Sequence, residues 1–156
     1  MENIITSISD IQIAVKAELE KNTYFVTHGV PILIENAKEI EFQIKSAMGS
    51  CGIVATVSTP SLNYGGNYTH QSEEQSPYWE ISGLNVVVVE NPTLNRGRAN
   101  YATALDTAIQ VAETLNPLPN VGLGTITQTT NGGLVIVTVN MKSNIVFSLE
   151  REDIIN

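Results

Sequence analysis

The only histidine of the sequence with carboxylates close by is His70, which is followed by Glu73 and Glu74. A metal site needs three or four ligands held in a fixed geometry, and this segment contains no second histidine. Short acidic segments of this kind are most often solvated surface. We therefore expect a polar loop here. A small metal-binding, ligand-binding or hydrolytic domain that uses these three residues is the alternative function.

The other candidate nucleophiles and bases lack the partners that catalysis requires. His28 has no acidic residue within four positions, so the sequence shows no carboxylate to orient its ring. Cys51 follows a predicted helix end, where the helix dipole disfavours the reactive thiolate. As the single cysteine it also excludes an intrachain disulfide and a four-cysteine zinc site. With no P-loop, GxSxG or HExxH motif, we expect no catalytic residue, no metal, no cofactor and no enzymatic activity.

Aromatic residues are concentrated in or beside the polar segment 61–77. Tyrosine and tryptophan are favoured at protein interfaces because they bury a large area and keep a polar group. Two interpretations stay open: the rings form an interface, or the segment folds back and they cover their own sheet. The aromatic residues concerned are Tyr64, Tyr68, Tyr78 and Trp79.

The charge balance limits the partners of the protein. Eight basic residues against sixteen acidic ones give a net charge of −8, so sequence-specific binding of nucleic acid is not expected without a basic patch. The closest basic pair, Arg96 and Arg98, completes the predicted interface. It either pairs with acidic residues of a neighbouring copy or forms a solvated pair near a helix start.

The uncharged polar content is typical of a subunit of an assembly. Charged residues form 15% of the chain, below the ~25% of an average soluble protein. Asn (15), Thr (15) and Ser (11) take their place. Such side chains can be buried against hydrogen-bond partners at lower cost than ions, which interface cores largely exclude.

Apolar periodicity predicts three helices. The first covers about residues 9–21 and begins at a capping box formed by Ser9 and Gln12. The second begins near Asn36 and ends at Gly49. The third covers about residues 98–115, with Tyr101, Leu105, Ala108, Ala112 and Leu115 on its buried stripe.

Short β-branched runs between these helices predict the strands. They cover residues 30–34, 53–59, 79–89 and 121–129, with a hairpin turn at 131–133 that leads into 134–140. Residues 145–149 form either a further strand or the far half of one bent strand. Two runs, Val86–Val89 and Leu134–Val139, are apolar on nearly every residue and demand cover on both faces.

This element order predicts an α+β fold with two layers. We expect a mixed, mostly antiparallel sheet of four or five strands, with three helices packed mainly on one face. Residues 1–156 are expected to form a single domain, in which 61–77 is an exposed loop or hairpin excursion and 150–156 a frayed tail. The acidic start and the lack of a long apolar run favour a soluble protein of intracellular origin.

Three helices cover only one side of such a sheet. The second face of the apolar strands must therefore be covered by something other than these helices. Either the sheet curls onto itself, or another copy of the chain packs there.

One segment resembles a known family. The strand Asn85–Glu90, the dipeptides Asn91-Pro92 and Asn95-Arg96, and the helix 101–115 are similar to prophage tail proteins, most closely the tail terminator or tail-completion proteins of long-tailed phages. The size and the element order follow the same pattern.

The resemblance implies a non-enzymatic virion protein, assembled in the host cytoplasm and located in the phage tail. It implies a ring, typically hexameric, that caps the tail tube and meets the head–tail connector. The partners would be further copies of the chain, the tail tube protein and the connector protein, without a membrane. The acidic balance would let DNA pass through such a ring without binding.

Overall fold

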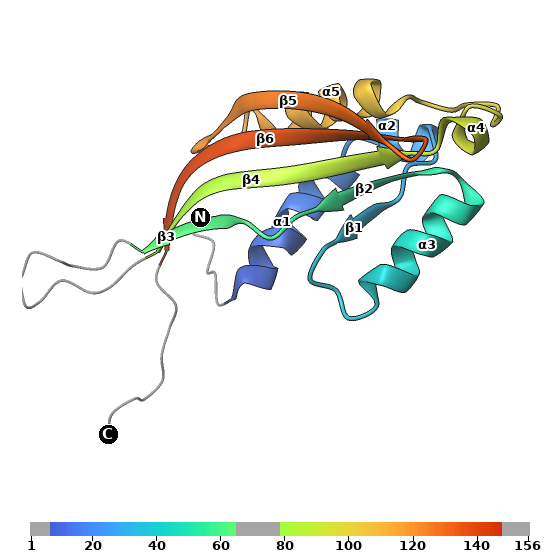
Figure 1. The fold of residues 1–156 in the computed structure, drawn as a ribbon. Helices are drawn as coiled ribbons and strands as arrows, with labels where there is room; N and C mark the ends of the chain where they lie inside the picture. The colour runs from blue at the N-terminus through green and yellow to red at the C-terminus, as the bar shows by residue number, and fades with distance from the viewer. Residues whose placement is uncertain (1–6, 65–78, 148–156) are drawn as a thin grey trace, which may run out of the picture.

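The protein forms one mixed β-sheet with helices on both of its faces (Figure 1). The computed structural model describes residues 7–64 and 79–147. The strand order is β1-β2-β4-β6-β5, and β3 pairs with the beginning of β4. The strands are β1 (Ile32–Ile34), β2 (Ile53–Val57), β3 (Ser61–Tyr64), β4 (Trp79–Glu90), β5 (Val121–Asn131) and β6 (Leu134–Phe147).

Three helices are long and two are single turns. The helices are α1 (Ile8–Glu20), α2 (Thr23–Thr27), α3 (Ile40–Ser50), α4 (Pro92–Asn95) and α5 (Ala104–Leu115). The predicted α+β class and the mostly antiparallel sheet are confirmed, since only β1 and β2 pair in parallel. The described part of the sheet has six strands, because residues 61–64, which we predicted to begin an exposed loop or hairpin excursion, form β3 and pair with β4.

Strand direction decides which face each crossover helix covers. β1 and β2 run parallel, whereas β4 and β5 both run antiparallel to β6 and opposite to β2. The connections β1–α3–β2 and β4–α5–β5 cross the sheet in the same sense, so right-handed crossovers place α3 and α5 on opposite faces. The prediction of two layers with the helices mainly on one face is therefore confirmed: α1 and α5 share the face of the main core, and α3 lies on the other.

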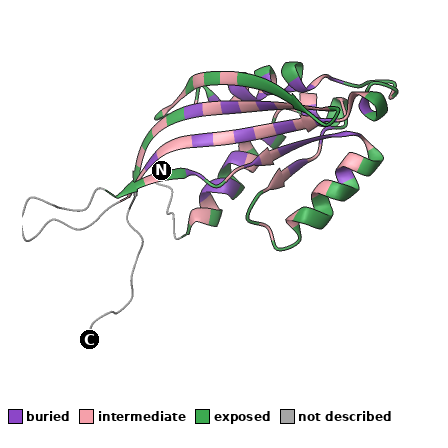
Figure 2. Cartoon of the chain, viewed as in Figure 1, coloured by how far each residue is buried: buried purple, intermediate pink, exposed green. Residues whose placement is uncertain are grey.

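The main core lies between the sheet and the helices α1, α2 and α5. On β4 the side chains that face it alternate with half-buried ones, which gives the striped pattern of Figure 2. The fully buried core residues include Leu19, Val86, Val88, Leu115 and Val137. A smaller contact lies on the other face, where Ala47 of α3 and Val54 of β2 are buried outside the main core.

Two helix starts differ from the capping signals in the sequence. The N-cap of α1 is Ser7, whose Oγ accepts a hydrogen bond from the Asp10 N–H. The predicted box at Ser9 fails because Gln12 is fully buried and donates its side-chain N–H to the Val57 carbonyl instead. Helix α3 starts at Ile40 after Glu39, without a side-chain cap.

The end of α3 also lies further along the chain than predicted. Gly49 is inside the helix, and the left-handed residue is Gly52, with φ of +77°. A Cβ at Gly52 would lie 2.7 Å from the Asn95 backbone nitrogen, so both the φ value and the close approach of α4 require glycine.

The third helix begins six residues later than the predicted start at 98. Thr103 is its N-cap and accepts a hydrogen bond from the Asp106 N–H at 3.1 Å. Tyr101 lies before the helix, and Leu105 points outward with 44% of its surface exposed. The buried face of α5 consists of Ala104, Thr107, Ala108, Val111, Ala112 and Leu115.

The C-terminal half of the sheet is a single hairpin. Gly132 and Gly133 both have positive φ in the predicted turn. β6 continues without interruption to Phe147, so the predicted segment from 145 is the far half of one strand. The structure describes no helix that is long and apolar enough to cross a membrane.

Candidate functional site

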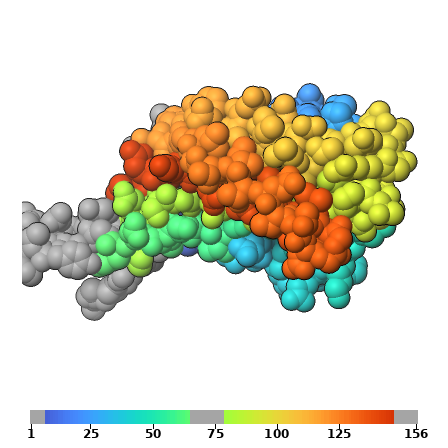
Figure 3. Space-filling model, turned by 45° about the horizontal axis from the view of Figure 1, so that its top comes forward, coloured from blue at the N-terminus to red at the C-terminus, as the bar shows by residue number. Residues whose placement is uncertain are grey.

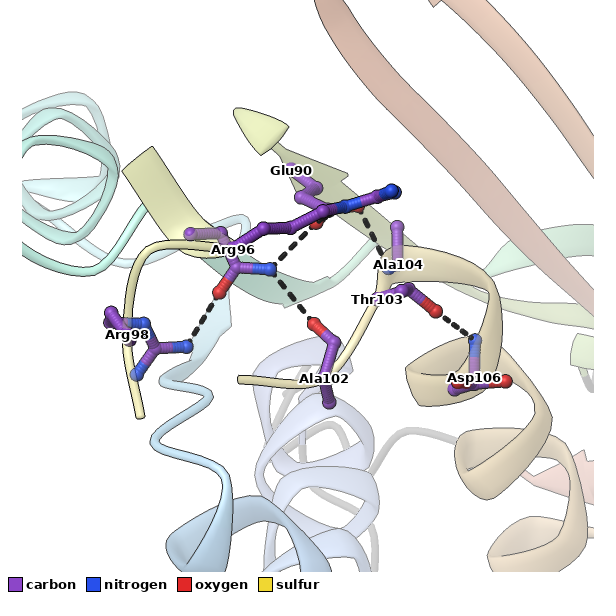
Figure 4. A network of polar contacts seen from close by, with 8 residues as sticks. Glu90, Arg96, Arg98, Ala102, Thr103, Ala104 and Asp106 are labelled. Atoms are coloured by element: carbon purple, nitrogen blue, oxygen red, sulfur yellow. Dashed lines mark hydrogen bonds and ion pairs between the residues drawn. The ribbon is translucent and has the colours of Figure 1, made fainter. Parts of the chain in front are cut away.

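A buried carboxylate lies at the end of β4, where the chain leaves the sheet. Glu90 is fully buried, because the alternation of β4 directs it to the same face as Val86 and Val88. It receives hydrogen bonds from the Asn95 side-chain N–H at 2.6 Å, from the Arg96 Nε at 3.0 Å and from the Ala104 N–H at 3.1 Å (Figure 4). One carboxylate therefore joins β4, α4 and the start of α5.

Asn95 extends this network to a second chain segment. Its side-chain N–H also donates to the Ala102 carbonyl at 2.8 Å, and its Oδ1 accepts from the Arg98 Nη2 at 2.6 Å. Arg98 in turn donates to the carbonyls of His28 at 3.1 Å and Gly29 at 3.4 Å. The segment 91–103 is thus attached both to the sheet and to the turn between α2 and β1.

The electrostatics of this network favour the ionised carboxylate. Burial by itself raises the pKa of Glu90, but the hydrogen bonds from Arg96, Asn95 and Ala104 and the charge of Arg96 outweigh burial. The net pKa of Glu90 is therefore below its ordinary value. The hydrogen bond with Glu90 likewise raises the pKa of Arg96.

This network stabilises the fold and offers no reactive group. The Glu90 oxygens are occupied by donors from the chain itself and have no exposed surface. Arg96 and Arg98 both find acceptors within the chain, so they are not a simply solvated pair. Pairing with acidic residues of a neighbouring copy stays a prediction; the Arg96 charge already faces Glu90, whereas the Arg98 acceptors are all uncharged.

The other candidate reactive residues have ordinary surroundings. The ring of His28 lies against Tyr24, with 4.4 Å between centroids, and its Nδ1 is 2.9 Å from the Asn100 carbonyl, to which it donates. The Cys51 thiol donates to the Ala47 carbonyl at the end of α3. Among the described residues no group of three or more His, Cys, Asp or Glu side chains could hold a metal ion. The segment with His70, Glu73 and Glu74 lies outside them.

Two of the four predicted interface aromatics can be placed. Trp79 is half-buried against the main core, and its ring contacts that of Tyr64 edge-on, with 5.1 Å between centroids. Tyr64 keeps 46% of its surface exposed. The pair therefore covers the end of its own sheet and leaves one ring accessible, while Tyr68 and Tyr78 lie outside the described residues.

Beyond α3, no helix of the described residues covers the second face of the sheet (Figure 1). We call the side chains of β4, β6 and β5 that point to this side the open face. The cross-strand pairs Val87–Thr138 and Val89–Ile136 lie at its centre, and Thr127 and Thr129 continue it on β5. Its members are Asn85, Val87, Val89, Leu134, Ile136, Thr138, Asn140, Thr125, Thr127 and Thr129, all half-buried or exposed.

The open face carries no charge. Residues 114–141 contain no Asp, Glu, Lys, Arg or His, although the chain as a whole has a net charge of −8. Figure 3 shows the β5–β6 hairpin (orange) as an exposed band across the molecule. An apolar centre with a rim of Thr and Asn has the composition of an interface core, from which charged residues are depleted.

The alternating threonines of residues 121–129, which we predicted as a strand, are a sequence signal for this surface. Thr125, Thr127 and Thr129 alternate around Ile126, which packs against the core. A period of two with threonine on one side places an uncharged polar row on the uncovered face. What the sequence lacked was the position of α3, which decides how much of that face is left uncovered.

Comparison with known proteins adds no relative. Neither a scan against protein-family models nor a search of curated proteins finds a match to this chain.

Proposed function

We propose that the protein is a non-enzymatic structural subunit of a long-tailed phage, similar to tail terminators, which assembles with copies of itself into a ring. The ring caps the tail tube and presents a surface to the head–tail connector. The single observation that carries self-assembly is the open face, a sheet surface with Val87, Val89 and Ile136 at its centre that no described helix covers.

Physical chemistry supports an assembly on this face. An antiparallel sheet can leave one face in water when that face is polar, but runs such as Val86–Val89, which are apolar on both sides, are typical of strands covered on two faces. In the single chain, Val86 and Val88 are fully buried, whereas Val87 and Val89 are only half-buried. A second molecule on this face would remove that apolar surface from water.

The phage assignment depends on the resemblance of residues 85–115 to tail terminators. The network around Glu90 gives this segment a role that suits a structural protein: it holds the strand, the Asn-Pro turn and the helix in one rigid unit without exposing a reactive group.

The test combines light scattering after size exclusion with electron microscopy of tail tubes incubated with the protein. We expect association that increases with protein concentration, and rings at one end of the tubes. The disabling variant is Thr127→Lys, which places a charge on the open face at an exposed position and should abolish both results. A wild-type protein that stays monomeric and never binds tubes would contradict the proposal.

A further inference from the structure

The outer side of α5 carries a second apolar surface, on the opposite side of the sheet from the open face. Leu105 and Ile109 lie one turn apart on this helix, and 44% and 40% of their surfaces are exposed. Asp106 and Glu113 are exposed on the same helix. We call Leu105 and Ile109 the α5 outer row.

The dimensions of this helix match those of the open face. With its 12 residues, α5 is roughly 18 Å long, at 1.5 Å per residue. The section Leu134–Asn140 of β6, along the middle of the open face, extends over roughly 20 Å at about 3.4 Å per residue. A helix of this length packed on the sheet would cover β4, β6 and β5 in the way that α3 covers β1 and β2.

The charges at the margins of the two surfaces are opposite. Lys142 follows the open-face residue Asn140 by two positions on β6, and Lys45 is exposed on α3, on the same side of the sheet. Neither lysine forms an ion pair within the described part of the chain, and neither do Asp106 and Glu113. By contrast, Lys16 of α1 and Lys21 at its C-cap both form ion pairs with glutamates of that helix.

Because the two surfaces lie on opposite faces of one sheet, they cannot meet within one molecule. We propose that the α5 outer row of one copy packs on the open face of the next, with Asp106 and Glu113 approaching Lys142 and Lys45. Such a contact is heterologous, and heterologous contacts close into rings when the rotation between copies allows it. This inference rests on the proposed self-assembly and specifies its mode.

Each surface can be disabled separately by one exposed substitution. Leu105→Lys places a charge in the α5 outer row, and Thr127→Lys places one on the open face. The matched controls are Ile13→Lys, at a 54% exposed position on α1, and Gln128→Lys, which strand alternation places on the other side of β5. Circular dichroism and thermal unfolding establish that all four variants fold.

The decisive measurement mixes the two disabled variants. Each alone should be monomeric at concentrations at which the wild type and the controls associate. A 1:1 mixture should form a dimer of one molecule of each kind and grow no further, because only one intact surface of each type remains. Light scattering gives the mass, and isotopic labelling of one variant shows by mass spectrometry that the dimer is mixed.

The possible results separate this inference from the function on which it rests. If Leu105→Lys still forms the wild-type oligomer, or if the mixture of two monomeric variants stays monomeric, the α5-to-sheet contact is wrong and self-assembly stands. If the wild type is a monomer at every concentration, both fail.

Discussion

At the scale of single residues, the most consequential side chain is Glu90. Sequence inspection had no reason to single it out, because it follows four valines and looks like the solvated end of a strand. Its full burial is tolerated because four donor groups from Asn95, Arg96 and Ala104 surround it. The same contacts explain why the Asn-Arg pair of the phage-like segment follows the strand at this spacing.

Replacing this carboxylate by an amide should destabilise the fold. We expect Glu90→Gln to lower the free energy of unfolding by about 2 kcal/mol at neutral pH, because the charge-assisted hydrogen bonds to Arg96 and Asn95 are weakened. The loss should be smaller than that of a fully buried pair, since the Arg96 side chain is 46% exposed and can turn to water. Urea unfolding measures the difference.

The pH dependence follows from the lowered pKa of Glu90. A carboxyl whose folded pKa lies below its unfolded value of about 4.3 stabilises the protein above that value, and its contribution is lost as the pH falls through the folded pKa. The difference in the free energy of unfolding between wild type and Glu90→Gln should therefore become smaller below about pH 4.3. If the free energy of unfolding changed with pH in the same way for wild type and Glu90→Gln, this would contradict the assignment.

At the scale of elements, β4 contributes side chains both to the main core and to the open face. It pairs with β2, β3 and β6, and its side chains divide between the core and the open face. Residues 86–89 are four identical valines in sequence, yet two are fully buried and two are half-buried. The difference arises because α5 covers one face of this strand and no described helix covers the other.

Two neighbouring substitutions on β4 test this division. Val88→Thr places a hydroxyl in the main core without a partner and should cost about 1–3 kcal/mol of unfolding free energy. Val87→Thr, on the open face, should change it by less than about 0.5 kcal/mol in the monomer. Urea unfolding at low protein concentration gives both values, and equal losses would mean that both faces are covered within one chain.

At the scale of the whole molecule, charge and apolar surface are distributed in a way that favours association on chosen faces. A net charge of −8 makes copies repel one another in general. The uncharged run 114–141 supplies β5 and the part of β6 before Lys142, so repulsion is weakest along these strands. This combination suits an ordered assembly better than unspecific aggregation.

Self-association should also appear in the thermal stability. Binding that involves only the folded state raises the melting temperature with protein concentration. We expect the wild type to show such a rise in differential scanning calorimetry, and Thr127→Lys to melt at a temperature that does not depend on concentration. A concentration-independent melting temperature for the wild type would argue against assembly of the free protein.

Local periodicity in the sequence was sufficient for the fold class, the mixed sheet, the β5–β6 hairpin turn and the approximate place of every long helix. Those features depend on neighbours along the chain, such as the Gly132-Gly133 pair or the valine run of β4. The helix starts were less predictable. Gln12 is buried in the core, where it donates to the Val57 carbonyl and does not cap α1. Helix α5 begins only at Ala104, whose N–H donates to Glu90.

The tertiary structure alone decided the rest. Arg98 donates to the carbonyls of Gly29 and His28, which lie 69 and 70 residues away, and no local pattern encodes such contacts. The extent of the open face depends on the direction of two crossovers, which place α3 and α5 on opposite sides of the sheet. The sequence determined which strands are apolar on both sides, and the packing of distant helices determined which of those sides no described helix covers.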